Sequence, residues 1–153
     1  MSDQLQVPVS TLPAAEGMEL PTRETEGSAG MDLRAALPDE EERILRPGER
    51  SLVPTGLKMA LPEGTEAQIR PRSGLAHRRG ITVLNSPGTI DSDYRGEVKV
   101  LLINHSHEPY AVTRGQRVAQ LVIRSYRRAT LLEKSDLEST SRGEGGFGHT
   151  GTQ

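Results

Sequence analysis

Two carboxylates and a tyrosine share one turn-rich stretch of this 153-residue chain, and they are its best candidates for chemistry. The stretch is Leu84–Val100, in which Asp91, Asp93 and Tyr94 lie between turn-forming residues and an alternating, strand-like pattern. An ionised carboxylate can accept a proton from water, and an aromatic ring can stack on a ligand. We therefore predict a strand-loop-strand hairpin with a small polar ligand at its mouth. The alternative is a solvated turn whose acids only cap the backbone.

A further carboxylate, Asp32, stands in the extended segment Ala29–Ala36. Its alternating pattern predicts that Met31 and Leu33 face one side of a strand and Asp32 the other. An isolated acid in such a place is more often a surface residue or a cap than part of a site.

The segment Pro71–Ile81 is the one place where the sequence predicts a helix, and the helix is short. Ser73 is the expected N-cap, and Gly80 the expected C-terminal residue in the left-handed conformation. Free backbone N–H groups at such a start can bind an anion, with Arg72 beside them. A capped connector helix would explain Ser73 and Gly80 without any ligand, but it leaves Arg72 unexplained.

The rest of the chain predicts strands that hold these residues in place. Pro- and Gly-containing turns separate short alternating segments. The clearest strands are Leu57–Leu61 and Ala67–Pro71, which a tight turn at Pro62–Gly64 joins. Two more are Glu97–Ile103 and Gln116–Ile123, and residues 5–9 give a weaker strand signal. Pro38–Arg46 is a charged, solvent-facing loop or strand edge. His105 and His107 lie between two of these strands, but a metal site would require further ligands.

Composition narrows the functional classes. The net charge is −2, so nothing indicates nucleic-acid binding through excess positive charge. The absence of cysteine excludes disulfides and thiolate metal sites, and no apolar run approaches membrane-spanning length. We therefore expect a cytoplasmic protein without nucleic-acid or membrane partners. With 3 Tyr, 1 Phe and no Trp, its core must be aliphatic, and we expect an oligomer that buries further surface.

The C-terminal segment, about residues 136–153, is polar and rich in glycine, which predicts a flexible arm. A single ring, Phe147, stands within its glycines, and its exposure needs a reason. Gln120 presents a similar problem within a strand, because an amide between apolar neighbours needs a partner.

Five segments together resemble the five motifs of the trimeric dUTPases, the deoxyuridine 5′-triphosphate nucleotidohydrolases, in the same order. They are AGMDLRAA (29–36), PRSGLAHRRGI (71–81), GTIDSDYRGE (88–97), GQRVAQLVI (115–123) and the glycine-rich 142–151. The resemblance implies a single all-β domain over residues 1–153, built as a jelly-roll-like β-barrel with one short helix and a flexible C-terminal arm. It also implies a homotrimer whose active sites are shared between subunits.

The reaction implied is hydrolysis of dUTP to dUMP and pyrophosphate, which limits uracil in DNA and supplies dUMP for dTMP synthesis. Asp91 would activate the water that attacks the α-phosphorus. Asp32 would hold Mg²⁺ through water, an arrangement for which one carboxylate suffices. The residues that would bind the substrate are Arg72, Ser73, Gly74 and Gln120 at the phosphates, Asn85, Gly88 and Ile90 at the uracil, Tyr94 on the deoxyribose, and Arg142, Phe147 and Gly148 from the arm.

Some alternatives stay open within this resemblance. Asp93 is the local alternative to Asp91 as the base. His149 stands where serine is common in the family, so the phosphate contact of a hydroxyl there is in doubt. The rival functions are a dCTP deaminase of the same superfamily, a nucleotide-binding sensor without catalysis, and a structural β-module.

Overall fold

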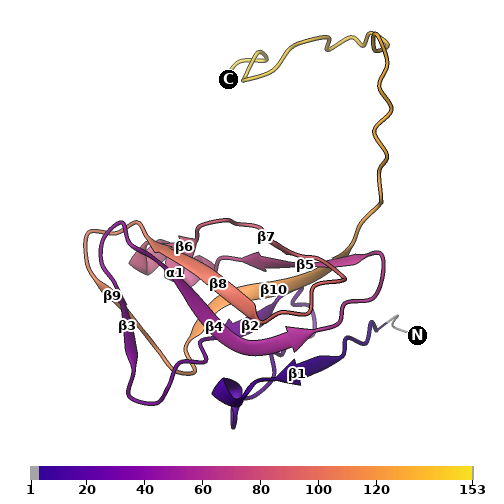
Figure 1. Ribbon diagram of the computed structural model, residues 1–153. Helices are drawn as coiled ribbons and strands as arrows, with labels where there is room; N and C mark the ends of the chain where they lie inside the picture. Colours follow the sequence, from indigo (N-terminus) through magenta and orange to yellow (C-terminus); the bar gives the residue numbers. More distant parts are fainter. Residues whose placement is uncertain (1–3, 153) are drawn as a thin grey trace.

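The computed structural model describes residues 4–152, and most of its strands form two four-stranded sheets (Figure 1). One sheet has the order β1-β4-β8-β6 and the other β2-β10-β5-β7; a separate pair joins β3 to β9. The strands are β1 (Val9–Thr11), β2 (Met31–Arg34), β3 (Glu42–Leu45), β4 (Arg50–Met59), β5 (Thr65–Arg70), β6 (Ile81–Val83), β7 (Gly88–Ile90), β8 (Val98–Asn104), β9 (Tyr110–Thr113) and β10 (Arg117–Ser125). The all-β, jelly-roll-like prediction is confirmed, but the strands do not close into a barrel.

Both sheets contribute to one aliphatic core, as the shortage of aromatic residues predicted. In β5 and β8 buried and less buried residues alternate, as expected for strands with one face on the core. The largest fully buried apolar side chains are Leu33, Leu37, Leu45, Ile81, Leu102, Val53, Val98, Val100, Val112 and Val118. Burial of branched side chains of this kind contributes about 1.5–3 kcal/mol each.

The predicted hairpin around Asp91 is wrong in its pairing. The strand before the acid, β7, pairs with β5, whereas the strand after it, β8, pairs with β4 and β6. Residues 91–97 therefore cross from one sheet to the other. The sequence could not distinguish these cases, because alternation reports which face of a strand is buried and not which strand lies beside it.

The pairing of β4 with β8 contains a bulge that matters for the site. Pro54 lies opposite Lys99 and Leu57 opposite Val98, so Thr55 and Gly56 are extra residues on β4. The Thr55 hydroxyl donates to the Val98 carbonyl at 2.5 Å, which fills part of the interrupted ladder. A bulge of this kind bends the strand and frees a backbone N–H for another partner.

The start of the helix and one strand differ from the prediction. Helix α1 (Ser73–Arg79) begins one residue earlier than predicted: Ser73 is its first residue, Arg72 is its N-cap and no side chain caps it, so the prediction of Ser73 as the cap is wrong. Gly80 ends the helix with φ +64°, as predicted. A 3-10 turn (η1, Pro13–Ala15) precedes β2. Strand β9 was missed, because only Val112 of its four residues is buried and it shows no alternation.

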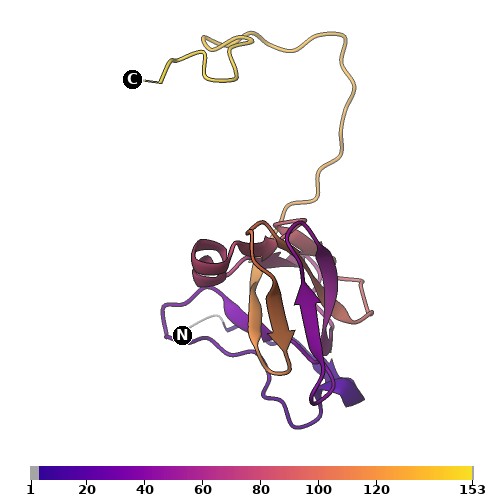
Figure 2. The same ribbon diagram turned by 90° about the vertical axis from the view of Figure 1, so that its left-hand side faces the viewer.

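Beyond β10 the chain leaves the sheets as an arm, residues 126–152. The arm has no helix or strand in its described part, and in both views it extends away from the body (Figures 1 and 2). Its apolar side chains are exposed: Leu131, Leu132, Leu137 and Phe147. Within residues 4–152, no helix is long and apolar enough to cross a membrane.

Candidate active site

A cleft of about 430 Å³ lies where the chain crosses between the sheets, and its size suits a small ligand. Of the residues expected to bind substrate or act on it, five line the cleft: Asn85, Gly88, Ile90, Asp91 and Tyr94. The sequence had assigned no ligand role to the other lining residues, which are Leu52, Ile69, Thr89, Glu97, Val98 and Lys99. The cleft thus combines an apolar floor from strand residues with a few polar groups at its rim.

The carboxylate and the aromatic ring are held by one turn. The Tyr94 N–H donates to the Asp91 carbonyl at 3.2 Å, and the Arg95 guanidinium donates to the Ser92 and Tyr94 carbonyls at 2.7 and 3.0 Å. These bonds satisfy the backbone and leave the Asp91 side chain exposed, without a hydrogen bond to any described residue. The reading in which these acids serve only to cap the turn is therefore wrong for Asp91, since its carboxylate is free to meet a ligand or water.

The Asn85 side-chain amide, which was expected to contact the uracil, lies close to Gly88. A Cβ added at Gly88 would lie 3.2 Å from Asn85 Nδ2 and 3.4 Å from Ile69 Cβ. Gly88 therefore allows the Asn85 side chain to pack against the start of β7 with little room to spare. This is a structural reason for glycine at a position that the resemblance had marked only as substrate-binding.

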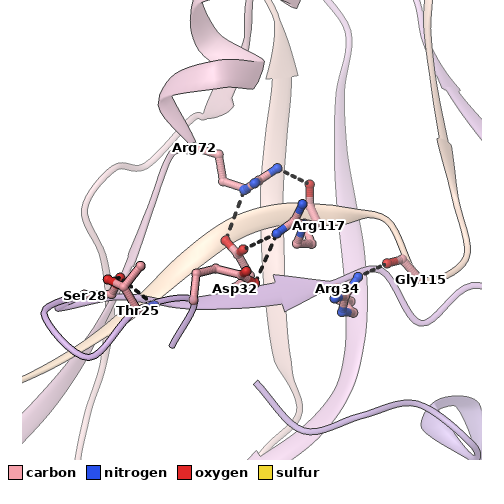
Figure 3. Close-up of polar contacts among 8 residues, drawn as sticks. Thr25, Ser28, Asp32, Arg34, Arg72, Gly115 and Arg117 are labelled. Carbon is pink, nitrogen blue, oxygen red and sulfur yellow. Dashed lines mark hydrogen bonds and ion pairs between the residues drawn. The ribbon is translucent and has the colours of Figure 1, made fainter. Parts of the chain in front are cut away.

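A second group of polar residues lies on the sheet that contains β10. Gln120 on β10 is opposite Asp32 on β2 and Arg70 on β5, so these three side chains share one face. Asp32 also accepts from two guanidinium groups (Figure 3): Arg72 Nε is 3.0 Å from Oδ1, and Arg117 Nη1 is 3.2 Å from Oδ2. We call Asp32, Arg72, Arg117 and Gln120 the cationic row.

Asp32 is 8% exposed, so the alternative of a surface carboxylate is wrong. Its burial is possible because both oxygens have charged donors, which offset much of the desolvation of the carboxylate. Arg117 is also 3.1 Å from Glu24 in the N-terminal segment. Neither Arg117 nor Glu24 was predicted to have a role, although an arginine beside the buried stretch of β10 was a usable signal.

The donor set around Asp32 does not form a metal cage. No group of three or more His, Cys, Asp and Glu side chains that could hold a metal ion occurs among residues 4–152. His105 and His107 therefore belong to no such group. A single carboxylate fits Mg²⁺ only where the ion keeps waters or takes ligands from phosphates. Asp32 fits that kind of contact and no closer one, because both of its oxygens already accept from arginines.

Ser73 and Gly74 are exposed at the start of α1, directly after Arg72. Their backbone N–H groups and the Ser73 hydroxyl therefore face solvent near the cationic row. Tyr110 is half-buried, and its hydroxyl hydrogen-bonds with the Gln116 side chain. Burial raises the pKa of Tyr110, while the Gln116 bond and then the charges of Arg79 and Arg72 partly oppose the shift.

The arm residues stand apart from both groups. Arg142 Nε donates to the Gly145 carbonyl at 2.8 Å, and the Gly145 N–H donates to the Arg142 carbonyl at 3.2 Å, so a local turn forms around the glycines. Phe147 has φ +49° and is fully exposed, followed by Gly148 at φ +80°. His149 packs on Gly145, where an added Cβ would lie 2.5 Å from its ring. None of these arm residues lines the cleft.

The expected site residues therefore form three separate groups in one chain: the cleft, the cationic row and the arm. A two-sheet β fold with a cleft of this size, a row of arginines and a free carboxylate is a small all-β protein suited to an anionic small-molecule ligand. The comparisons with known proteins narrow this class.

A family model described as dUTPase matches residues 16–151. The chain is 62% identical over 141 residues to the deoxyuridine 5′-triphosphate nucleotidohydrolase of Mesorhizobium japonicum, covering 92% of this chain and 88% of that protein. It is 60% identical over 142 residues to the protein of the same description from Rhizobium meliloti, covering 93% and 89%. This chain belongs to the dUTPase family.

Solved structures agree on the fold. A mutant of the dUTPase of Staphylococcus bacteriophage 80alpha, solved with dUpNHpp, matches with a TM-score of 0.85 at 24% identity, covering 97% of this chain and all of that one. A mutant dUTPase from phage phi11 of S. aureus matches with a TM-score of 0.75 at 22% identity, covering 86% and 98%, and is described as showing the coordination of a structural Mg(II) ion.

Proposed function

We propose that this chain hydrolyses dUTP to dUMP and pyrophosphate, as a dUTP diphosphatase. The observation that carries the proposal is the free Asp91 carboxylate at the rim of a nucleotide-sized cleft, in a chain of the dUTPase family. The activity keeps uracil out of DNA and supplies dUMP for dTMP synthesis. We place the reaction in the cytoplasm and the whole chain in a single domain.

Asp91 acts as the general base on the attacking water. A water oxygen forms a bond to the α-phosphorus while its proton passes to the Asp91 carboxylate. The bond from the α-phosphorus to the bridging oxygen of the β-phosphate breaks, and pyrophosphate leaves with the electron pair. The exposure of Asp91 and the absence of any described hydrogen-bond partner for its side chain support this role. Asp93 lies two residues on and does not line the cleft, which favours Asp91.

Selectivity for the nucleoside resides in the cleft. The Asn85 amide and the backbone of Gly88 and Ile90 hydrogen-bond the uracil edge, which rejects cytosine by its different pattern of donors and acceptors. The close packing of Asn85 on Gly88 supports a tight fit at the uracil edge, where we expect a thymine methyl group to clash. The Tyr94 ring packs on the deoxyribose and excludes a 2′-hydroxyl by contact.

The phosphates bind at the cationic row. Arg72, the exposed Ser73 hydroxyl, the Gly74 N–H and the Gln120 amide contact the triphosphate, as arginine forks and free N–H groups suit anionic oxygens. Asp32 would hold Mg²⁺ through water, and the bound ion would neutralise charge on the phosphates. Asp32 supports this role because its carboxylate lies on the same face as Gln120 and beside Arg72.

The active unit is a homotrimer in which different subunits supply the cleft, the cationic row and the arm. The separation of the three groups within one chain supports this, since one copy alone does not bring them together. An apolar groove of about 260 Å³ between the N-terminal strand and β10 offers surface for another subunit. The arm closes the site: Phe147 covers the uracil, Arg142 contacts the terminal phosphate, and the backbone at Gly148 wraps the phosphate chain.

The test is product analysis with purified protein and Mg²⁺, using dUTP, dCTP, dTTP and UTP in parallel. Pyrophosphate release from dUTP alone supports the proposal and both selectivities. Ammonia from dCTP would move the chain to the deaminase branch of the superfamily. Tight dUTP binding without turnover would identify a sensor. Light scattering of the same preparation measures the mass of the particle, and a monomeric mass with full activity would contradict the shared site.

A further inference from the structure

The Tyr94 ring has an unusual neighbour: it lies directly on the backbone of Gly96. A Cβ added at Gly96 would lie 2.5 Å from Tyr94 Cζ and 2.9 Å from Cε2, and closer still to the hydroxyl oxygen. Real Cβ atoms essentially never approach other atoms this closely. Any side chain at position 96 would therefore displace the ring.

The backbone of Gly96 does not itself require glycine. The residues with left-handed φ among the described part of the chain are other glycines, together with Glu40 and Phe147. Alanine could adopt the conformation of Gly96 without strain, so the reason for glycine here is the space taken by the ring and not the conformation of the chain.

The ring is also fixed at its polar end. The Tyr94 hydroxyl donates to the Glu97 carbonyl at 2.9 Å. The Glu97 side chain is 19% exposed, and its carboxylate accepts from the Gly56 N–H at 3.0 Å, the backbone group that the β4 bulge sets free. The acceptor of the tyrosine hydroxyl is thus tied to an interior strand of the sheet. Lys99 Nζ, 3.9 Å from the other Glu97 oxygen, adds a weaker contact.

These contacts fix a ring that would otherwise be mobile. Tyr94 is 45% exposed, and an exposed tyrosine on a turn normally samples several rotamers. Here the hydroxyl end of the ring lies against Gly96, and the hydroxyl is bound to the Glu97 carbonyl. The remaining surface forms part of the wall of the cleft.

We infer that Gly96 is a positioning residue: by having no side chain, it seats the Tyr94 ring against the cleft and thereby sets the discrimination between deoxyribo- and ribonucleotides. The inference rests on the proposed function, in which Tyr94 packs on the sugar. A ring that leaves this seat no longer fits closely against the sugar, so its exclusion of a 2′-hydroxyl weakens and UTP gains access. The same displacement weakens contact with dUTP, but it does not touch Asp91.

The experiment compares kcat/KM for dUTP and for UTP in the wild-type chain, Gly96→Ala, Tyr94→Ala and the double variant. Gly96→Ala is expected to lower the dUTP/UTP ratio by about tenfold or more, which is the usual size of a change in steric fit. The change should come through a higher KM for dUTP and a higher kcat/KM for UTP, with kcat for dUTP little altered. In the Tyr94→Ala background, the same substitution should change the ratio no further.

Two further variants protect the conclusion. Tyr94→Phe keeps the ring but loses the hydrogen bond to the Glu97 carbonyl. Because Tyr94 is exposed, this substitution should not disturb folding, so its effect reports on the position of the ring. It should lower the ratio, but by less than Gly96→Ala. Gly27→Ala is the matched control, since a Cβ there meets nothing within 4 Å, and it should leave the ratio unchanged.

The outcomes separate the two proposals. A wild-type chain that is silent with dUTP overturns the proposed function and this inference together. An active wild-type chain whose ratio is unchanged by Gly96→Ala and Tyr94→Phe overturns this inference alone. An equal effect of Gly96→Ala with and without the Tyr94 ring also overturns it, because the glycine would then act through something else.

Discussion

The body of the molecule and its arm differ in how they hold the predicted functional residues. In the body, each site residue is fixed by contacts that have other structural uses: a turn bond at Asp91, two ion pairs at Asp32, and a glycine under Tyr94. In the arm, which extends away from the sheets, Phe147 is fully exposed and Arg142 donates to the Gly145 carbonyl of the arm itself. The body is therefore organised without a ligand, whereas the role that we propose for the arm requires it to become ordered on binding.

This difference separates stability from activity along the chain. Changes in the body act on packing and on chemistry together, because the same residues serve both. Changes in the arm remove no buried contact, since its apolar side chains are already exposed. Four measurements probe this contrast.

The largest effect is expected for Asp91→Asn. The amide cannot accept the proton of the attacking water, and loss of a general base typically slows turnover by about 100- to 10,000-fold. Binding of dUTP should persist, because the turn is held by backbone and Arg95 contacts that the substitution leaves in place. Steady-state kinetics and a binding titration measure the two quantities. Asp93→Asn is the matched control and should retain most of the rate; if it is the more damaging change, the base is Asp93.

Deletion of residues 142–153 should lower kcat by about 100-fold or more, the size associated with loss of substrate positioning and closure. The melting temperature and the number of subunits in the particle should stay at the wild-type values, because the deleted residues bury nothing in the described body. Phe147→Ala, in the intact arm, should give a smaller loss in the same direction. A truncated chain that turns over dUTP at the normal rate would contradict the role of the arm as a lid.

Unlike the deletion of the arm, Asp32→Asn should lower the free energy of unfolding and the activity together. Loss of the buried carboxylate charge leaves Arg72 and Arg117 without their shared partner and should lower the free energy of unfolding by about 1–3 kcal/mol. The Mg²⁺ concentration needed for half-maximal rate should rise. Urea denaturation and a magnesium titration provide the measurements. Asp39→Asn is the control: its carboxylate is 90% exposed beside Arg114, so the stability change should lie at about 0–1 kcal/mol.

The smallest effect concerns alkaline stability and Tyr110. Burial raises its pKa above the ordinary value of 10.0, so the unfolded chain releases the phenol proton at lower pH than the folded chain does. This contribution to stability is present below pH 10 and is lost as the pH rises through the folded pKa. Tyr110→Phe should therefore flatten the decline in stability above pH 10 in denaturation experiments. A slope equal to that of the wild-type chain would contradict this reading.

Much of the fold was predictable because it depends on local patterns. The alternation of Ala67 and Ile69 with polar residues predicted β5, and Gly80 ended the helix where a left-handed residue was expected. Pairing was not predictable, because β7 and β8 satisfy the same pattern whichever sheet they join. Strand β9 was not predicted, because only one of its four residues is buried.

The site shows the same division. Asp91 and Tyr94 were recognisable because they stand in one short segment, and their turn places both at the cleft. The surroundings of Asp32 were not recognisable, since Arg72 and Arg117 lie 40 and 85 residues away along the chain. Its burial depends on those two charges, and no local pattern records them. The resemblance to a family supplied roles for such residues, but the contacts that explain their placement came from the fold.

The bulge in β4 also gives the molecule an internal reporter. The Gly56 amide belongs to an interior strand, yet its proton is bound by the Glu97 carboxylate and not by the neighbouring strand. Its rate of exchange with deuterium therefore follows the opening of residues 91–97, while amides in the regular part of β4 follow the sheet. One backbone signal, resolved in a spectrum of the unliganded protein, thus distinguishes loosening of residues 91–97 from loosening of the fold.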